Sequence, residues 1–371
     1  MNKKKIKLYT NFQADYIYGG GAIVRKLLPI FQSGIQTNWT YFKRAHEDKQ
    51  QRLQQNNVKY TPTELWSYKK GIRRFQKEYE AITFFCTAFC QAIKNRIFGY
   101  THVWIVLDPG IIDFAYWLLR FSKSETVIHI SVHDDCRIDY PSEKPTNLTR
   151  IGRILTRAKS IDVIGENLQQ EYLKEFKVES FVFRRGVLTP PPYNTKTNST
   201  KLHLIFVGSS HSDECWNILL KHLSTYNIEF HIKVFGASNF QKRLNEVPTN
   251  VSFMFMGNQP ENEILSKYND FDAAIFFWDF FSENRIKYSV STKLTTYLQM
   301  GLPIIGLIHP DNESHQIFNY GAGIDITDPK CNITNYLNNT NISENINRYV
   351  SSKFNENVML KNFVDNCSLF R

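Results

Sequence analysis

Short apolar runs and amphipathic stretches alternate along the first half of this 371-residue chain. The apolar runs have the length and composition of buried strands, and they lie at 6–10, 103–107, 126–132, 160–164 and 180–183. Between them, amphipathic stretches with apolar residues every three or four positions predict helices at 22–31, at 68–97, after Gly110 up to Phe121, at 146–158 and at 167–176. Regular alternation of strand and helix predicts a largely parallel sheet that helices cover on both faces.

The pattern restarts after a segment with three consecutive prolines at 190–192. Further strands are predicted at 202–207, 231–235, 251–256, 273–277 and 303–307, with helices from 213, at 260–268, at 292–300 and at 354–367. The length also favours two domains over one core. We therefore predict an α/β protein with doubly wound domains at 1–186 and 201–350, a linker at 187–200 and a helical end at 351–371.

Charge is unevenly divided between the halves. Residues 1–186 hold 30 Lys and Arg against 18 Asp and Glu, whereas residues 187–371 hold 15 against 17. The start of the helix predicted at 68–97 is especially basic, with Lys69, Lys70, Arg73, Arg74 and Lys77. Such a half suits an anionic partner, and we expect an anionic membrane surface rather than nucleic acid, for which no module is recognised. The apolar face of this helix either lies on a bilayer or covers the sheet.

Two further patterns limit the class of protein. No apolar run reaches the roughly 18–20 residues of a spanning helix, and the first thirty residues lack the apolar centre of a signal peptide, which predicts a cytoplasmic protein. The six cysteines show no paired metal-ligand spacing, so we expect buried free thiols, including Cys86 and Cys90, which lie four residues apart.

Candidate binding residues directly follow the predicted strands. Ligands of open parallel sheets bind outside the carboxyl ends of the strands, where glycine permits close approach and helix N-termini attract phosphate. The residues at such positions are Gly19, Gly20, Gly21, His133, Asp134, Asp135, Gly208, Ser209, Gly236, Gly257 and Asn258. Plain turns would explain the glycines equally well. Asp270 and Asp272 match a metal-binding Asp-x-Asp, but capping and turn formation explain them better.

The order of these motifs resembles the GT-B glycosyltransferases, especially bacterial enzymes like those of glycosyltransferase family 4. The matching segments are GGG (19–21), HISVHDD (129–135), SIDVIGENLQQEYLKEF (160–176), LIFVGS (204–209), VSFMFMGNQPENEILSKYNDFDAAIFF (251–277) and STKLTTYLQMGLPIIG (291–306), the last being the most specific. The resemblance implies two Rossmann-like domains that face a cleft, with a final helix that crosses back to the first domain.

The resemblance also implies roles for individual residues. A nucleotide-sugar donor, with UDP favoured over GDP, would bind Gly208, Ser209, Gly236, Gly257, Asn258, Ser291, Thr292, Lys293 and Thr296. His133 with Asp134 or Asp135 would act at the reacting sugar, and Gly19–Gly21 would form an acceptor or phosphate loop. The implied enzyme is a retaining, metal-independent hexosyltransferase without a cofactor. It would serve a glycan or lipid-linked acceptor of bacterial surface polysaccharide or glycoconjugate synthesis, peripherally on the inner face of the cell membrane.

The sequence departs from the family pattern at two places. Two glutamates that family members carry are replaced by Tyr288 and Thr296, and a hydroxyl is a weaker substitute for a carboxylate. The Arg and Lys expected after Gly208 are also missing, so Lys293 is expected to meet the diphosphate charge, with Arg285 and Lys287 on the neighbouring loop. These departures leave a second hypothesis open, a non-catalytic GT-B subunit that partners an active glycosyltransferase.

Overall fold

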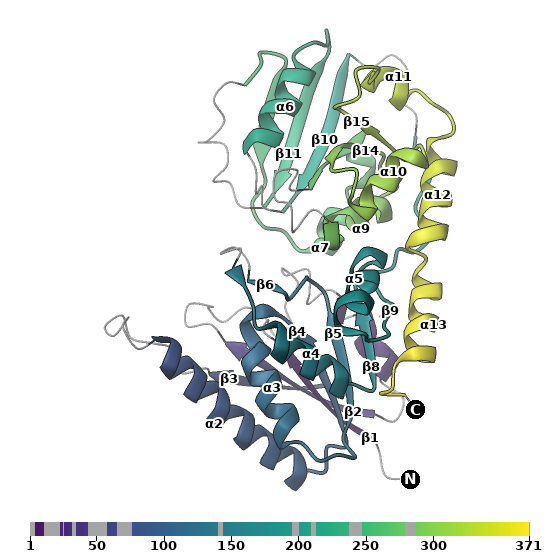
Figure 1. Cartoon of the computed structure of the whole chain (residues 1–371). Coiled ribbons are helices and arrows are strands. Elements are labelled where there is room, and N and C mark those ends of the chain that lie inside the picture. Colours follow the sequence, from purple (N-terminus) through teal and green to yellow (C-terminus); the bar gives the residue numbers. More distant parts are fainter. Residues whose placement is uncertain are drawn as a thin grey trace. The chain divides into compact units, whose positions relative to one another are not determined.

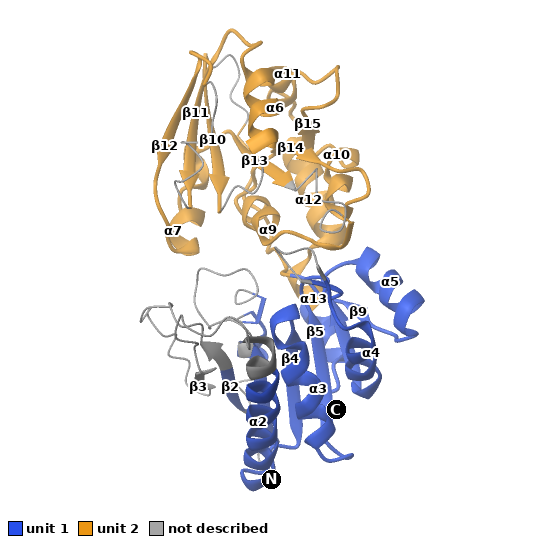
Figure 2. Cartoon of the chain, turned by 60° about the vertical axis from the view of Figure 1, so that its left-hand side comes forward, with its two compact units in different colours: residues 1–184, 360–371 blue, residues 185–359 orange. Residues whose placement is uncertain are grey.

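The computed structural model divides into two compact units, which are described separately (Figures 1 and 2). Unit 1 comprises residues 1–184 and 360–371, and unit 2 comprises residues 185–359. Within them the structure describes residues 4–10, 23–24, 26–31, 35–43, 58–64, 76–139, 144–194, 200–208, 213–236, 247–278 and 287–370.

Unit 1 is built on a seven-stranded sheet in the order β3-β2-β1-β4-β5-β8-β9, and every neighbouring pair is parallel. The strands are β1 (Lys4–Thr10), β2 (Ile35–Lys43), β3 (Val58–Glu64), β4 (His102–Leu107), β5 (Val127–Val132), β8 (Ser160–Val163) and β9 (Phe181–Val182). A separate antiparallel ribbon pairs β6 (Ile138–Asp139) with β7 (Lys144–Pro145). Every residue of β4 is buried, as expected for a strand that lies inside a sheet covered on both faces.

Three helices of unit 1 lie side by side on one face of this sheet (Figures 1 and 2). They are α2 (Gln76–Ile97), α3 (Ile112–Phe121) and α4 (Leu148–Arg157), and α5 (Glu166–Phe176) follows β8. Local capping explains where two of these elements begin. The Asn147 side chain accepts from the Arg150 amide at the start of α4, and Asp108 caps the turn before α3 through the Gly110 amide.

The last residues of the chain complete the core of unit 1. Helix α13 (Glu356–Asn366) carries Phe363, which is fully buried, with its ring centroid 4.7 Å from that of Phe183 and 6.0 Å from that of Trp104. The Ser368 amide donates to Ser160 Oγ at 2.8 Å. Residues separated by about two hundred positions in the chain therefore share one core.

Unit 2 repeats the architecture with a six-stranded parallel sheet in the order β12-β11-β10-β13-β14-β15. The strands are β10 (Lys201–Val207), β11 (Glu229–Phe235), β12 (Val251–Phe255), β13 (Ala273–Trp278), β14 (Ile304–Ile308) and β15 (Gly323–Asp325). The helices are α6 (Asp213–Leu223), α7 (Glu261–Leu265), α9 (Thr292–Gln299), α10 (Gln316–Asn319), α11 (Ile333–Leu337) and α12 (Ile342–Lys353). Trp216 of α6 lies at the centre of an apolar core against β10 and β13.

Two parallel-sheet α/β units confirm the predicted fold class. The sequence pattern did not predict β2, β3 or β15. Strand β2 was missed because its buried positions include polar side chains that bond to β1: Lys7 Nζ donates to Asn38 Oδ1 at 2.6 Å, and Trp39 Nε1 to Thr10 Oγ1 at 2.8 Å.

The proline segment after residue 187 forms backbone contacts inside unit 2. The Val187 amide donates to the Phe354 carbonyl at 2.7 Å, and the Tyr193 amide donates to Ser343 Oγ at 2.7 Å. Residues 187–194 therefore have fixed partners in this unit.

Candidate functional site

Three glycines follow the ends of neighbouring strands of unit 2, and backbone hydrogen bonds join the segments in which they lie. Gly208, Gly236 and Gly257 follow β10, β11 and β12 with φ angles of +94°, +149° and +68°. The Gly208 amide donates to the Phe235 carbonyl at 2.6 Å, and the Gly236 amide donates to the Gly257 carbonyl at 3.0 Å. A Cβ on Gly236 would lie 2.3 Å from the Gly208 carbonyl oxygen. We call these three residues the glycine edge; positive φ favours glycine at all three, and close approach of backbone requires it at Gly236.

Lys293 lies against this edge. Its Cε would be 2.7 Å from a Cβ placed on Gly208, and its Nζ is 5.2 Å from the ring centroid of Phe206. Lys293 is in the first turn of α9, where Ser291 is the N-cap and accepts from the Lys293 amide at 3.3 Å. An ammonium and a helix N-terminus that converge on a bare backbone edge make an anion-binding arrangement.

Thr296 lies one turn further along α9 and is bound to a carboxylate from another helix. Its Oγ1 donates to Glu261 Oε1 at 2.9 Å, and Arg185 Nη1 lies 2.5 Å from the same oxygen. Thr296 and Arg185 are buried, whereas the Glu261 side chain is 26% exposed. Glu261 was not among the predicted site residues because its proximity to Thr296 spans 35 positions of sequence. In space it supplies a carboxylate beside the position where the resembling family has its own.

In unit 1, His133 follows the end of β5 and is buried, with only 6% of its surface exposed. Neither ring nitrogen has a hydrogen-bond partner among the residues that the structure describes. Burial lowers the pKa of His133 to about 4, so the imidazole is neutral near pH 7. A buried ring with one unused donor and one unused acceptor is costly to leave unpaired, which marks a position for a ligand hydroxyl.

A second histidine, His129, lies four positions earlier, within β5. His129 Nε2 is 2.8 Å from Asp162 Oδ1, and both side chains are fully buried. Asp162 also accepts from Ser131 Oγ at 2.5 Å. Burial acts to lower the pKa of His129, but the neighbouring Cys367 sulfur and Asp162 outweigh it and raise the pKa to about 10. The sequence pattern did not single out this pair.

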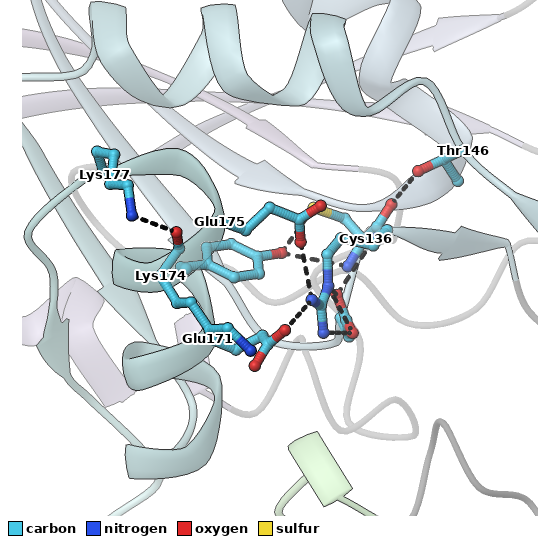
Figure 3. A network of polar contacts seen from close by, with 9 residues as sticks. Cys136, Thr146, Glu171, Lys174, Glu175 and Lys177 are labelled. Carbon is cyan, nitrogen blue, oxygen red and sulfur yellow. Dashed lines mark hydrogen bonds and ion pairs between the residues drawn. The ribbon is translucent and has the colours of Figure 1, made fainter.

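Asp135 is held in an ion-pair network (Figure 3). Arg137 Nε donates to Asp135 Oδ1 at 2.9 Å and Nη2 donates to Oδ2 at 2.8 Å. Arg137 Nη1 also donates to Glu171 and to Glu175, each at 2.9 Å. The adjacent Asp134 is exposed. Of the two aspartates, Asp134 is therefore the more exposed.

Several predicted residues lie outside the described part of the chain. They are Gly19, Gly20, Gly21, Ser209, Lys69, Lys70, Arg73, Arg74 and Arg285. Asn258 is exposed directly after the glycine edge, and Tyr288 is half-buried. Lys287 is exposed, four residues before Ser291, the N-cap of α9.

Among the residues that the structure describes, no group of three or more His, Cys, Asp or Glu side chains could hold a metal ion. Asp272 instead accepts from the His203 amide of β10 at 2.7 Å, a structural role that links the start of β13 to β10 and is neither a cap nor a turn. None of the described helices is long and apolar enough to cross a membrane. All six cysteines are free thiols, but Cys86 and Cys90 are exposed on α2 rather than buried as expected.

Comparison with known proteins gives structural neighbours only. No protein-family model matches the sequence, and no curated relative matches it. Solved structures do match over nearly the whole chain. Sucrose-phosphate synthase from Thermosynechococcus elongatus superimposes with a TM-score of 0.67 at 11% identity, covering 98% of both chains. An E. coli trehalose-6-phosphate structure bound with UDP-2-fluoro glucose gives 0.64 at 10% identity over 99% of both chains.

A third neighbour is Anabaena HepE in complex with UDP and glucose, with a TM-score of 0.60 at 10% identity over 98% of this chain and 99% of that one. These neighbours are glycosyltransferases of one architecture. The chain has the GT-B fold. In GT-B terms, unit 1 is the amino-terminal Rossmann-like unit and unit 2 the carboxyl-terminal one. Membership of glycosyltransferase family 4 stays a prediction.

Proposed function

We propose that this GT-B protein is a glycosyltransferase that moves a sugar from a nucleotide-sugar donor, with UDP favoured as the nucleotide. The observation that carries the proposal is the glycine edge of unit 2 with the Lys293 ammonium against Gly208 at the start of α9. Positive charge and a helix N-terminus beside a strand end suit a diphosphate. UDP in the structures of HepE and of the E. coli neighbour supports this choice of ligand.

The Thr296–Glu261 pair is the proposed ribose contact. A carboxylate accepts hydrogen bonds from two hydroxyls, which a threonine alone cannot do. Glu261 keeps part of its surface exposed while Oε1 is engaged by Thr296 and Arg185. Glu261 of α7 would thus take the place of the glutamate that family members carry at the position of Thr296.

The proposed reaction is a metal-independent transfer with retention of configuration. The acceptor hydroxyl oxygen bonds to the anomeric carbon, the bond from that carbon to the diphosphate breaks, and the hydroxyl proton passes to the departing phosphate oxygen. Neutral His133 would hydrogen-bond a hydroxyl of the reacting sugar, and Asp134 would position the acceptor. Lys293 and the amides of α9 would stabilise the charge that develops on the diphosphate.

The proposed setting is bacterial surface polysaccharide or glycoconjugate synthesis, with a glycan or lipid-linked acceptor at the inner face of the cell membrane. The support is the basic first half of the chain, with 30 Lys and Arg against 18 Asp and Glu.

The test is calorimetric titration with UDP and GDP, followed by assay with the corresponding sugars. Lys293→Ala should weaken UDP binding by about 1–3 kcal/mol, since a charge-assisted hydrogen bond is lost. Lys221→Ala is the matched control, because Lys221 is an exposed lysine on α6 away from the glycine edge. Unchanged affinity in Lys293→Ala removes Lys293 from the site, and no nucleotide binding by the unaltered protein refutes the proposal.

A non-catalytic GT-B subunit is the second candidate. Tyr288 and Thr296, in place of two glutamates, favour it. A protein that binds UDP but neither hydrolyses nor transfers from any UDP-sugar would support this alternative over the enzyme.

A further inference from the structure

An exposed apolar stripe runs along α2. Ile82, Phe85, Phe89, Ile93 and Ile97 follow one another at three- or four-residue spacing, and between 39% and 72% of each side chain is exposed. This spacing places them on one face of the helix over about 22 Å. The buried residues of the helix, including Ala88 and Ala92, lie beside the stripe, next to Phe85 and Phe89. The sequence left open whether the apolar face of this helix covers the sheet or lies on a bilayer. The exposed stripe shows that α2 carries apolar side chains on its outer surface.

Aromatic rings of α3 widen this stripe. The Phe85 ring lies 5.0 Å from that of Trp117 and 5.3 Å from that of Phe121, and Phe89 lies 5.3 Å from Phe121. Trp117 in turn packs against Tyr116 at 5.1 Å. Trp117 and Phe121 are only half-buried, so the two helices present one continuous apolar surface.

Arginines of α4 border the aromatic side of this surface. Arg153 Nη1 donates to the Tyr116 hydroxyl at 3.1 Å, and the Arg150 guanidinium lies 5.4 Å from the Tyr116 ring centroid. Helices α2, α3 and α4 together contain seven Lys and Arg against three Asp and Glu. We call the outward surface of these three helices the α2–α4 face.

We infer that the α2–α4 face binds the surface of an anionic lipid bilayer. Apolar and aromatic side chains beside a cationic border are suited to the boundary between acyl chains and headgroups. Guanidinium groups bind phosphate with two parallel hydrogen bonds, which favours phospholipid headgroups. The inference rests on the proposed function only for its purpose, which is to bring the protein to a membrane-borne acceptor.

Charge argues against a second copy of the chain as the occupant. A two-fold dimer brings the same patch of both subunits together. Two α2–α4 faces in contact would place basic residues opposite basic residues with few carboxylates to compensate. An anionic bilayer supplies the opposite charge. Apart from Lys77, the basic residues of these three helices lie outside the cluster at 69–77.

The experiment is flotation of the purified protein with vesicles of phosphatidylcholine, alone or mixed with phosphatidylglycerol. The protein should bind the mixed vesicles preferentially, and less as salt rises. Replacing three stripe residues in Ile82→Gln/Phe89→Gln/Ile97→Gln should lower the partition coefficient at least roughly tenfold. Arg120 is exposed in the last turn of α3 and adds to the positive charge of this face. Replacing it together with the border residue Arg153, in Arg120→Gln/Arg153→Gln, should lower binding to mixed vesicles by about fivefold per charge.

The matched control is Leu173→Gln/Met254→Gln, because these side chains are exposed to similar extents (51% and 56%) on α5 and β12. This control should bind vesicles like the unaltered protein. UDP affinity should be unchanged in all variants, so loss of vesicle binding and failure of the proposed donor site are separate results.

A fluorophore on Cys86 gives a second readout that does not depend on replacing the stripe. Cys86 is an exposed thiol next to Phe85, and Cys90→Ser removes the other exposed thiol of α2. Its emission should shift to the blue with mixed vesicles and not with phosphatidylcholine alone. Equal binding to both vesicles, no binding at low salt, or a dimer that the triple variant converts to a monomer would each overturn the inference.

Discussion

At the scale of single residues, a carboxylate from another helix lies beside the position at which the resembling family has a glutamate. Thr296 has no acidic side chain, but Glu261 Oε1 lies 2.9 Å from its hydroxyl and is also bound by Arg185. One guanidinium balances one carboxylate there. A second carboxylate introduced at position 296 would be adjacent to Glu261, and like charges at that distance repel.

We therefore predict that Glu261→Gln lowers the preference for UDP over 2′-deoxy-UDP, by about 1.5–3 kcal/mol, as expected for a hydrogen bond to a charged group. Adding Thr296→Glu to Glu261→Gln should restore the preference, whereas Thr296→Glu alone should weaken binding of both nucleotides. Calorimetric titration of the four proteins completes a double-mutant cycle. An equal loss for both nucleotides in Glu261→Gln would show that Glu261 only supports the fold.

His133 gives a prediction about pH. Its pKa is lowered to about 4 in the folded protein, against about 6.5 in the unfolded chain. Between these values the unfolded chain binds a proton that the folded protein does not, so the free energy of unfolding falls as the pH falls through this window. Lowering the pH from 7 to 5 should cost about 2 kcal/mol through this residue.

The measurement is urea unfolding of the native protein and of His133→Gln at both pH values. The variant has no titratable group at this position. Its free energy of unfolding should therefore fall by about 2 kcal/mol less than that of the native protein when the pH is lowered from 7 to 5. Identical losses in the two proteins would mean that His133 is protonated as easily in the folded state. Binding of a sugar hydroxyl by neutral His133 should also be independent of pH above about 5.

At the scale of elements, the glycine edge depends on how three strands end. Gly236 and Gly257 both have positive φ, but their surroundings differ. A Cβ on Gly236 would meet the Gly208 carbonyl oxygen at 2.3 Å, whereas a Cβ on Gly257 would meet nothing within 4 Å. The first contact involves backbone that cannot move without separating β10 from β11.

Gly236→Ala should therefore destabilise unit 2 by at least about 3 kcal/mol, and Gly257→Ala by only about 1–2 kcal/mol, the cost of positive φ alone. Thermal unfolding of the two variants measures the difference. The same Gly236→Ala change should also weaken UDP binding, because Gly208 cannot keep its place against Lys293. Equal stability in the two variants would contradict this account of the edge.

The sequence predicts most of these elements, because strands such as β4 and β13 are nearly all apolar and their flanking helices are periodic. It fails where buried side chains are polar. Strand β2 buries Thr37, Asn38 and Thr40, which a polarity pattern assigns to a loop. Site residues that directly follow strands could be listed from sequence. Glu261 and His129 could not, because their roles come from contacts across 35 and 33 positions.

At the scale of the whole molecule, unit 1 is assembled from two distant segments of chain. Phe363 lies among the rings of Trp104, His129, Phe181 and Phe183. Phe363→Ala should destabilise unit 1 by about 3–5 kcal/mol, the cost of a cavity of that size. Amide hydrogen exchange should show faster exchange in β4, β5 and β8 while β10, β11 and β13 keep their protection.

Phe354→Ala is the matched change in unit 2, since Phe354 is equally buried and packs against Tyr349. It should speed amide exchange in β10, β11 and β13, while β4, β5 and β8 keep their protection. Loss of protection in both units from either substitution would mean that the two units unfold as one.

The divided sequence of unit 1 has a consequence for how the protein is made. A ribosome synthesises residues 1–184 first, then all of unit 2, and only then the segment that carries Phe363 and Ser368. At about 5–20 residues per second, unit 1 waits roughly ten to forty seconds for the side chains that fill its core. During that time unit 2, which is continuous in sequence, is free to fold. A chain released before residue 360 would thus carry a finished unit 2 and an unfinished unit 1, a substrate for proteases and chaperones rather than a partly working enzyme.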